Sequence, residues 1–291
     1  MRPDHPPLGS SSKPRHSIRH VLLLVIVAIF VMGILTVTEI SRMSNPSDPH
    51  HELLPKTIYP IGTASRHEPS GYGPPRTTAL RGFKLKYVND FVKTGIPKGW
   101  FLFHGVPGGA PGGQFSPRHV TVRGGRLLLN TYRDRHFHNR WVTGGLCQCG
   151  RPYLYGAFFV RSRFTGLGPN EVELLWPANN QWPPEIDFNE TTSTNGSTST
   201  VHWGYANYIQ QIGKHGVNML AWHTWGIIWT SNKIEYVLDG HVWGSITNAQ
   251  EIPRIPMRLD LEQRTECLIH VQCPKVPVQM QVDWVAEYRT N

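Results

Sequence analysis

From residue 82 onward the chain alternates short runs of β-branched and aromatic residues with glycine-containing turns such as Gly124-Gly125 and Asp239-Gly240. No stretch has the 3.6-residue period of a long amphipathic helix. Many short strands that each bury one face pack most readily as two antiparallel sheets. The pattern predicts an all-β fold over residues 80–291, a two-sheet antiparallel β-sandwich of the jelly-roll type.

The N-terminal part has a different character. Residues 1–20 are polar and basic, and residues 21–37 form an uncharged apolar run about 26 Å long as a helix. With its flanks this run reaches across a bilayer core of about 30 Å, and the basic residues before it favour a cytoplasmic N-terminus. We expect a cytoplasmic tail over residues 1–20 and a transmembrane signal anchor over residues 21–40. A cleaved signal peptide is the alternative, although no convincing cleavage site follows the run.

Residues 41–79 are rich in proline, serine, glycine and histidine, without a strand or helix period. Such composition is typical of a disordered linker. Both alternatives for the N-terminal segment place the following domain outside the cytoplasm, either held at the cell membrane or secreted.

Three carboxylates fall within six residues, at Glu185, Asp187 and Glu190. Side chains alternate along a strand, so Glu185 and Asp187 would share one face while Glu190 would point to the other. A β-bulge near Phe188 or Asn189 adds one residue and returns Glu190 to the face of the first two acids, and such bulges recur beside active sites. The segment predicts one groove lined by all three acids.

Paired carboxyls can hydrolyse glycosidic bonds. A retaining glycosidase uses two, about 5 to 5.5 Å apart: one attacks the anomeric carbon, and the other protonates the leaving oxygen and then deprotonates water. Crowded acids also repel, which raises the pKa of one of them and keeps it protonated near neutral pH as the general acid. We expect Glu185 as nucleophile, Glu190 as acid/base and Asp187 as an assistant that orients Glu185 through a shared proton. The alternative is a solvated polar strand or a cation site.

Apolar neighbours favour the catalytic interpretation. Ile186 and Phe188 suit a buried opposite face, while Trp176 and Trp182 precede the acids and have flat faces on which sugar rings stack. With the upstream runs "LLWP" and "WP", the segment resembles the E-x-D-x-x-E signature of glycoside hydrolase family 16, the laminarinase-like group.

The resemblance covers roughly residues 80–291, in family order. It includes "SPRHVTVRGGRLLLNT" and "YGAFFVRSRF" before the acids, and "VHWG", "WHTWGIIWTSNKIEYVLDG" and "VDWVAEY" after them. Two departures, Pro184 where the family usually has glycine and Asn189 where related sequences often have proline, leave every carboxylate in place. The resemblance implies that one sheet curves into a substrate cleft and carries the acid strand.

Neighbouring strands supply further candidates. The family has a histidine that hydrogen-bonds near the nucleophile, and His202 in "VHWG" takes that place; a structural histidine is the alternative. Arg161 is expected either to reach the cleft or to be a partly buried structural arginine. Trp225, Trp229 and Trp284 fit core positions. The substrate-binding candidates are Trp176, Trp182, His202, Trp203 and Arg161.

No cofactor is expected for catalysis, but many relatives of this family carry a structural calcium ion on the face away from the cleft. Asp283 in "VDWV" takes the position where the family's last strand offers a carboxylate, and backbone carbonyls would complete an oxygen ligand set. The alternative for Asp283 is a strand-end acid paired with a nearby arginine.

The four cysteines, Cys147, Cys149, Cys267 and Cys273, suit disulfides in an exported domain. A Cys267–Cys273 bridge closes a short loop and is the first expectation, whereas a bridge between Cys147 and Cys149 would be strained. Their spacings match no usual zinc finger.

The formal net charge of +9 is spread along the chain without a nucleic-acid-binding motif. It favours attraction to an anionic wall or membrane over binding to nucleic acid. The sequence predicts a monomeric catalytic domain that is an endo-acting, retaining glycosidase on β-linked glucan or galactan. A transglycosylase on cell-wall glycan and a non-catalytic glycan-binding module are the alternatives, and the presence of both glutamates argues against the second.

Overall fold

The structure, a computed structural model, describes residues 59–75 and 80–290. The chain divides into two units, Met1–Pro55 and Lys56–Asn291, and every described residue belongs to the second. The predicted tail and membrane segment, and residues 41–58 of the predicted linker, lie outside the described residues. Within the described ranges no helix is long and apolar enough to cross a membrane.

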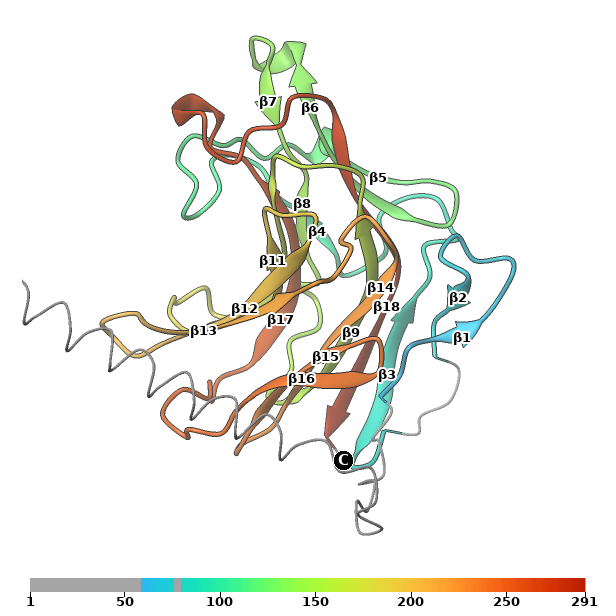
Figure 1. The fold of residues 1–291 in the computed structure, drawn as a ribbon, viewed down its shortest axis with the longest axis vertical. Helices are drawn as coiled ribbons and strands as arrows, with labels where there is room; N and C mark the ends of the chain where they lie inside the picture. Colours follow the sequence, from blue (N-terminus) through green and yellow to red (C-terminus); the bar gives the residue numbers. More distant parts are fainter. Residues whose placement is uncertain (1–58, 76–79, 291) are drawn as a thin grey trace, which may run out of the picture. The chain divides into compact units, whose positions relative to one another are not determined.

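Two antiparallel sheets make up the second unit (Figure 1). The seven-stranded sheet has the order β13 (Tyr208–His215), β12 (Gly196–Trp203), β11 (Glu185–Thr191), β10 (Asn170–Pro177), β17 (Met257–Arg264), β8 (Gly145–Cys147) and β4 (Phe101–Leu102). The nine-stranded sheet runs β16 (His241–Ile246), β15 (Ile234–Leu238), β14 (His223–Trp229), β9 (Gly156–Phe164), β18 (Val278–Thr290), β6 (Leu127–Asp134) and β5 (Val120–Val122), with β3 (Phe83–Asn89) beside β18 and β7 (Arg140–Val142) beside β6.

The remaining elements are small. A separate hairpin joins β1 (Thr63–Ala64) to β2 (Tyr72–Gly73), and the helices of the described residues are three short 3-10 turns, η1 (Pro117–His119), η2 (Arg135–Phe137) and η3 (Cys267–Ile269). The all-β two-sheet sandwich predicted from the sequence is therefore confirmed.

The main hydrophobic core fills the space between the two sheets. Its members include Phe158 and Val160 from β9 and Ile186 and Phe188 from β11, all with no exposed surface. The alternation of β11 places these apolar side chains inside and the acids outside, as the sequence predicts. Replacing Phe188 by alanine would open a cavity at the centre and cost about 3–5 kcal/mol of folding free energy.

A second, smaller core lies on the outer face of the nine-stranded sheet. Its members include Phe159, Trp284 and Tyr288, and Tyr59 packs against it. The predicted linker therefore ends earlier than residue 79, because residues 59–75 are structured and lie on this sheet. Individual hydrogen bonds hold them, such as Trp284 Nε1 to the carbonyl of Tyr72 (2.8 Å). Such contacts leave no periodic pattern in the sequence.

Acidic side chains also occupy the space between the sheets. Glu171 and Glu173 of β10 are 2% and 0% exposed, and they face inward with Leu175. Glu173 Oε1 accepts a hydrogen bond from Ser162 Oγ (2.5 Å), and Glu171 Oε1 accepts one from Gln263 Nε2 (2.7 Å). Burial raises the pKa of Glu173 to about 8 and that of Glu171 well above its ordinary value.

Candidate active site

Strand β11 contains the bulge that the acid spacing requires. Against β10, the adjacent residues Glu173 and Leu174 pair with Asn189 and Asp187, so Phe188 is the extra residue on β11. The pairing of β11 with β12 shifts over the same stretch. The extra residue re-aims the strand, and Glu185, Asp187 and Glu190 all line one cavity.

This cavity is a cleft of about 890 Å³ on the face of the seven-stranded sheet opposite the core. The end of β4 and the loop that follows it, residues 102–109, border it on one side, and Ile209 and Gln211 of β13 lie on the other side. Of the predicted binding residues, the cleft brings together Trp176, Trp182 and His202 with the three acids.

Glu185 is held by one hydrogen bond and lies across from His202. The indole Nε1 of Trp182 donates a hydrogen bond to Glu185 Oε2 (2.6 Å), and His202 lies directly opposite Glu185 in the β11–β12 pairing. Trp182 is still 43% exposed, so its ring also remains open toward the cleft. The sequence assigned Trp182 to sugar stacking only, and its bond to Glu185 adds an orienting role.

Asp187 is the acid on which the crowding acts most clearly. Burial raises the pKa of Asp187 well above its ordinary range, the charges of Glu185 and Glu190 raise it further, and Arg264 opposes them. Its buried Oδ1 has no hydrogen-bond partner as a carboxylate. A protonated Asp187 gains a donor that can be shared with Glu185, which gives this atom a partner.

His202 lies beside the same acid. Its Nδ1 is 2.9 Å from Asn207 Oδ1, and its Nε2 is 3.7 Å from Asp187 Oδ2. The bond to an acceptor oxygen places the proton of neutral His202 on Nδ1, which leaves Nε2 as the ring atom that faces Asp187.

Glu190 has partners that the sequence analysis missed. Asn170 Nδ2 donates to Glu190 Oε1 (2.6 Å), and Arg264 Nη2 donates to the same oxygen (3.1 Å). Arg264 Nε also lies 3.6 Å from Glu262 Oε2, so one guanidinium lies between two carboxylates. Burial raises the pKa of Glu262 to about 7, with Arg264 opposing and the charges of Glu185 and Glu190 reinforcing the rise.

Strand β17 supplies these missed groups in a regular pattern. Its residues 258–264 read "RLDLEQR", in which Arg258, Asp260, Glu262 and Arg264 alternate with residues that face the core. A strand with apolar residues on one face and charges throughout the other is a sequence signal for a polar cleft. This alternation is present in the sequence, whereas the family motif contains only the acids of β11.

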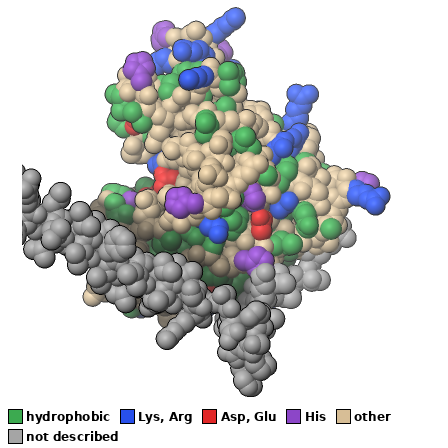
Figure 2. Space-filling model, in the orientation of Figure 1, with side chains coloured by type: hydrophobic (Ala, Val, Ile, Leu, Met, Phe, Trp, Pro, Cys, Tyr) green, Lys and Arg blue, Asp and Glu red, His purple; other side chains and the backbone are tan. Residues whose placement is uncertain are grey.

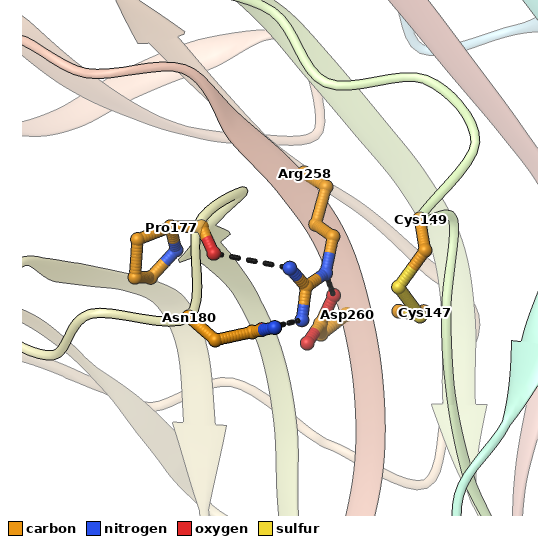
Figure 3. Close-up of a disulfide and its surroundings, with 6 residues drawn as sticks. All are labelled: Cys147, Cys149, Pro177, Asn180, Arg258 and Asp260. Atoms are coloured by element: carbon orange, nitrogen blue, oxygen red, sulfur yellow. Dashed lines mark hydrogen bonds and ion pairs between the residues drawn. A yellow bond between two sulfur atoms is a disulfide. The ribbon is translucent and has the colours of Figure 1, made fainter.

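Arg258 is fixed at the edge of the cleft near a disulfide (Figure 3). It donates to the carbonyl of Pro177 (3.0 Å) and to Asn180 Oδ1 (2.8 Å), and its Nε is 3.3 Å from Asp260 Oδ1. Asp260 pairs with Cys147 across β17 and β8.

Cys147 and Cys149 form a disulfide, although a bridge across one residue was expected to be strained. The chain turns directly after β8, which brings their Cα atoms to 5.0 Å, inside the usual range of about 4.4–6.8 Å for a disulfide. The expected Cys267–Cys273 disulfide is present too. All four cysteines are therefore oxidised, and none is a thiolate for zinc.

Two predicted binding residues lie away from the cleft. Trp203 follows His202 on β12, so alternation turns it to the other face, where it packs against the main core and Tyr208. Arg161 belongs to β9 in the other sheet and faces outward, where it donates to Ser70 Oγ (2.6 Å) and stacks over Tyr72. The structural alternative for Arg161 is the correct one. Trp225, Trp229 and Trp284 are buried core residues, as expected.

Asp283 lies on the face away from the cleft. It is fully buried, its Oδ2 accepts a hydrogen bond from the backbone N–H of Ser70 (3.0 Å), and its Oδ1 has no hydrogen-bond partner. Burial raises the pKa of Asp283, and the nearby charge of Arg161 opposes this. The unpartnered oxygen suits a cation, but the resident guanidinium and the lack of any group of three metal-ligating side chains in the described part fit calcium poorly. These features favour the alternative, an acid beside an arginine, over the predicted calcium ion.

The model of the family "Glycosyl hydrolases family 16" matches residues 114–265, over half of the chain. The chain belongs to glycosyl hydrolase family 16. As a member it is a glycosidase that hydrolyses O-glycosyl bonds, and the resemblance noted in the sequence is confirmed.

Solved structures share the fold of this family 16 chain at low sequence identity. The laminarinase from Rhodothermus marinus has a TM-score of 0.64 and 20% identity, and the match covers 73% of this chain and 99% of that one. The catalytic domain of an endo-1,3-β-glucanase (laminarinase) from Thermotoga petrophila has a TM-score of 0.60 and 17% identity, covering 72% and 98%. SCLam, a non-specific endo-β-1,3(4)-glucanase, has a TM-score of 0.62 and 19% identity, covering 81% and 98%. No curated protein matches the chain significantly.

Proposed function

We propose that this chain is a retaining endo-β-glycanase that cleaves β-glucan. The observation that carries the proposal is the bulge at Phe188, which sets Glu185, Asp187 and Glu190 along one cleft whose floor is the seven-stranded sheet. A strand without the bulge would turn Glu190 into the core. The bulge lies at the position on β11 where the three acids need a common face.

The proposed reaction has two steps. Glu185 attacks the anomeric carbon while Glu190 gives its proton to the leaving glycosidic oxygen, which yields a glycosyl–enzyme ester and a free sugar end. Glu190 then removes a proton from water, whose oxygen displaces Glu185 and restores both carboxyls. Asp187, protonated in the crowded site, shares its proton with Glu185 and keeps that side chain aimed.

Several features support an endo-acting enzyme on a β-linked chain. The cleft volume lies near the upper end of the roughly 300–1,000 Å³ that is usual for ligand sites, so it has room for more than one sugar unit. Trp176 and Trp182 provide aromatic surface along it. Neighbours of the same fold are laminarinases and endo-β-1,3(4)-glucanases, which favours β-glucan over β-galactan as the substrate.

A screen of purified protein against laminarin, mixed-linkage glucan, xyloglucan, agarose and arabinogalactan tests the substrate class. We expect new reducing ends from a β-glucan and mid-sized products early in the reaction. Glycosyl transfer to sugar acceptors in place of hydrolysis would point to the transglycosylase alternative. Binding without turnover on every polymer would point to a glycan-binding module and overturn the proposal.

The roles of the two glutamates have a separate test. In Glu190→Ala, azide should restore cleavage of an activated substrate and yield a β-glycosyl azide, because azide attacks the ester of Glu185 from the opposite face. An α-glycosyl azide would show that the two roles are reversed.

We also propose that residues 21–40 anchor the protein in the cell membrane with a monomeric catalytic domain outside the cytoplasm. The support is the apolar run and its basic N-terminal flank. Full-length protein should remain with membranes after alkaline carbonate extraction. Recovery of only soluble, N-terminally trimmed protein from the medium would show a cleaved signal peptide instead.

A further inference from the structure

The hairpin of β6 and β7 and the loop between β17 and β18 lie at the same end of the domain (Figure 1). The loop leaves β17 next to β6, since Thr131 Oγ1 donates to Gln263 Oε1 (3.0 Å). It returns at Val278, which pairs with the same Thr131. We call residues 132–142 and 265–277 together the hairpin end.

The loop exposes apolar side chains in a fixed conformation. Leu268, Ile269 and Val276 are 61%, 67% and 62% exposed, and Val271 is also exposed. The Cys267–Cys273 disulfide and the backbone pairing of Glu266 with Val271 close the loop on itself. These side chains therefore cannot reach the core, and a cluster of this kind on a protein surface often marks an interaction site.

The exposed charges around this loop are all positive. Each of the two acids in the hairpin end is buried and bonded: Asp134 accepts from the backbone N–H of His136 (2.8 Å), and Glu266 from that of Gly112 (2.7 Å). Figure 2 shows the lysine, arginine and histidine side chains gathered over this end of the molecule. The exposed cations of the hairpin end and its edge are Arg118, Arg133, Arg135, Arg140 and Lys275.

We propose that the hairpin end docks on an anionic lipid bilayer, with the apolar loop entering the interfacial layer and the arginines facing lipid phosphates. Apolar side chains beside cations gain free energy at such a surface from two sources: burial among acyl chains and attraction to the headgroups. An anionic polysaccharide would satisfy the cations but would leave Leu268 and Ile269 in water. The combination therefore favours a bilayer as the occupant.

Docking would also position the cleft. Residues 102–109, which border the cleft, belong to the same loop as Gly112, whose N–H binds Glu266 beside the apolar side chains. The end of the cleft near β4 would then face material at the lipid surface. This inference does not depend on the cleavage chemistry, so it can fail while the proposed hydrolase activity stands.

A local fluorescent probe on the full-length protein tests the docking. The native cysteines are paired in disulfides, so Val276→Cys adds a single free thiol that can carry nitrobenzoxadiazole. Val242→Cys, on β16 at the opposite end of the domain in Figure 1, is the matched control. The N-terminal segment precedes Tyr59, whose N–H donates to the carbonyl of Gly240 beside β16 (2.9 Å), so anchoring by that segment alone would bring residue 242 at least as near the bilayer as residue 276.

Vesicles of phosphatidylcholine with phosphatidylglycerol should shift the emission of the probe at residue 276 to shorter wavelength, and vesicles of phosphatidylcholine alone should not. The probe at residue 242 should stay unchanged in both. Equal shifts at the two positions, or no shift at residue 276, would overturn the proposal.

Two double variants separate the contribution of the cations to vesicle binding from that of the apolar side chains. Arg135 and Arg140 make no side-chain bond within the described structure, so Arg135→Gln with Arg140→Gln should leave folding intact. It should weaken the vesicle response roughly 25-fold, about fivefold for each cation near the surface. Leu268→Ser with Ile269→Ser should abolish the shift. Hydrolysis of a soluble glucan should be unchanged in both.

Dextran sulfate serves as a soluble polyanion without an apolar phase. If it binds as tightly as the anionic vesicles, and Leu268→Ser with Ile269→Ser leaves vesicle binding unchanged, the surface recognises polyanions in general and the bilayer proposal is wrong. Weaker binding of the polymer together with loss of the shift in the serine variant supports the bilayer.

Discussion

Two groups of acids lie on opposite faces of the same sheet. Glu171 and Glu173 of β10 point between the sheets, where Gln263 and Ser162 bind them. Asp187 and Glu190 of the neighbouring β11 point into the cleft. Burial raises the pKa of Glu173 to about 8, and burial with two neighbouring charges raises that of Asp187.

The difference shows that a raised carboxyl pKa does not by itself mark an active site. The interior acids have the same shift in direction as Asp187, but no substrate can reach them because they lie between two packed sheets. What separates the cleft acids is access to substrate and the nearby guanidinium of Arg264. A functional assignment from titration needs that geometric support.

Replacing a glutamate by glutamine on each of the two faces of the sheet should give the largest difference in kcat. Glu185→Gln should lower kcat at least about a thousandfold, since an amide cannot serve as the carboxylate nucleophile. Glu173→Gln should leave kcat nearly unchanged, because this side chain faces the core. Assays of both variants at one pH, with melting curves to confirm folding, make the comparison. Substantial activity in Glu185→Gln, after contamination is excluded, would falsify its assignment as nucleophile.

Arg264→Gln tests whether the guanidinium of Arg264 gives the cleft acids a catalytic role that the interior acids lack. Arg264 orients Glu190 and lowers the pKa of both Asp187 and Glu262. Its loss should reduce kcat/KM by up to about a hundredfold through misplacement of Glu190. It should also move the alkaline limb of the pH profile upward, because the cleft acids keep their protons to higher pH. A rate loss without any change in the profile would mean that Arg264 acts only on packing.

The β-sandwich and the acids of the cleft could be predicted from the sequence alone. Alternation in β11 predicts Ile186 and Phe188 in the core, and the spacing of the acids predicts the bulge, because only an extra residue gives them a common face. These features depend on local geometry of one strand, which the sequence records directly.

Contacts between distant segments were harder to predict. Trp203 was predicted to lie in the cleft together with His202, although alternation along β12 puts it on the opposite face. Asn170 lies 20 residues from Glu190, and the location of Arg161 depends on which sheet receives β9. Sheet membership is set by pairing across the whole chain, so residue spacing alone does not specify it.

The interior acids should make stability depend on pH. Burial raises the pKa of Glu173 and of Glu287 to about 8, far above the ordinary value of 4.5 that the unfolded chain approaches. Between these values the folded protein holds protons that the unfolded chain has released, so stability is highest at the acid end and falls as pH rises toward 8. Melting temperatures measured from pH 5 to about 8 should decline.

Glu173→Gln sharpens this test because glutamine keeps the shape and can still accept from Ser162. It removes one titrating group, which should flatten the decline by up to about 1.4 kcal/mol per pH unit. Glu235→Gln is the matched control, since Glu235 lies near the surface and pairs with Lys233. An identical slope in wild type and Glu173→Gln would show that Glu173 is ionised in the folded protein.

The smallest expected effect concerns calcium at Asp283, on the side of the nine-stranded sheet away from both acid groups. A bound ion would stabilise the folded state by mass action, so chelation would lower the melting temperature by several degrees and leave the initial rate at low temperature unchanged. Because Arg161 already places positive charge beside Asp283, we expect a shift close to zero. Melting in chelator and in millimolar calcium, with Asp283→Asn as the control, decides the matter. A clear loss of stability in chelator that Asp283→Asn abolishes would establish the ion and show that the guanidinium does not replace it.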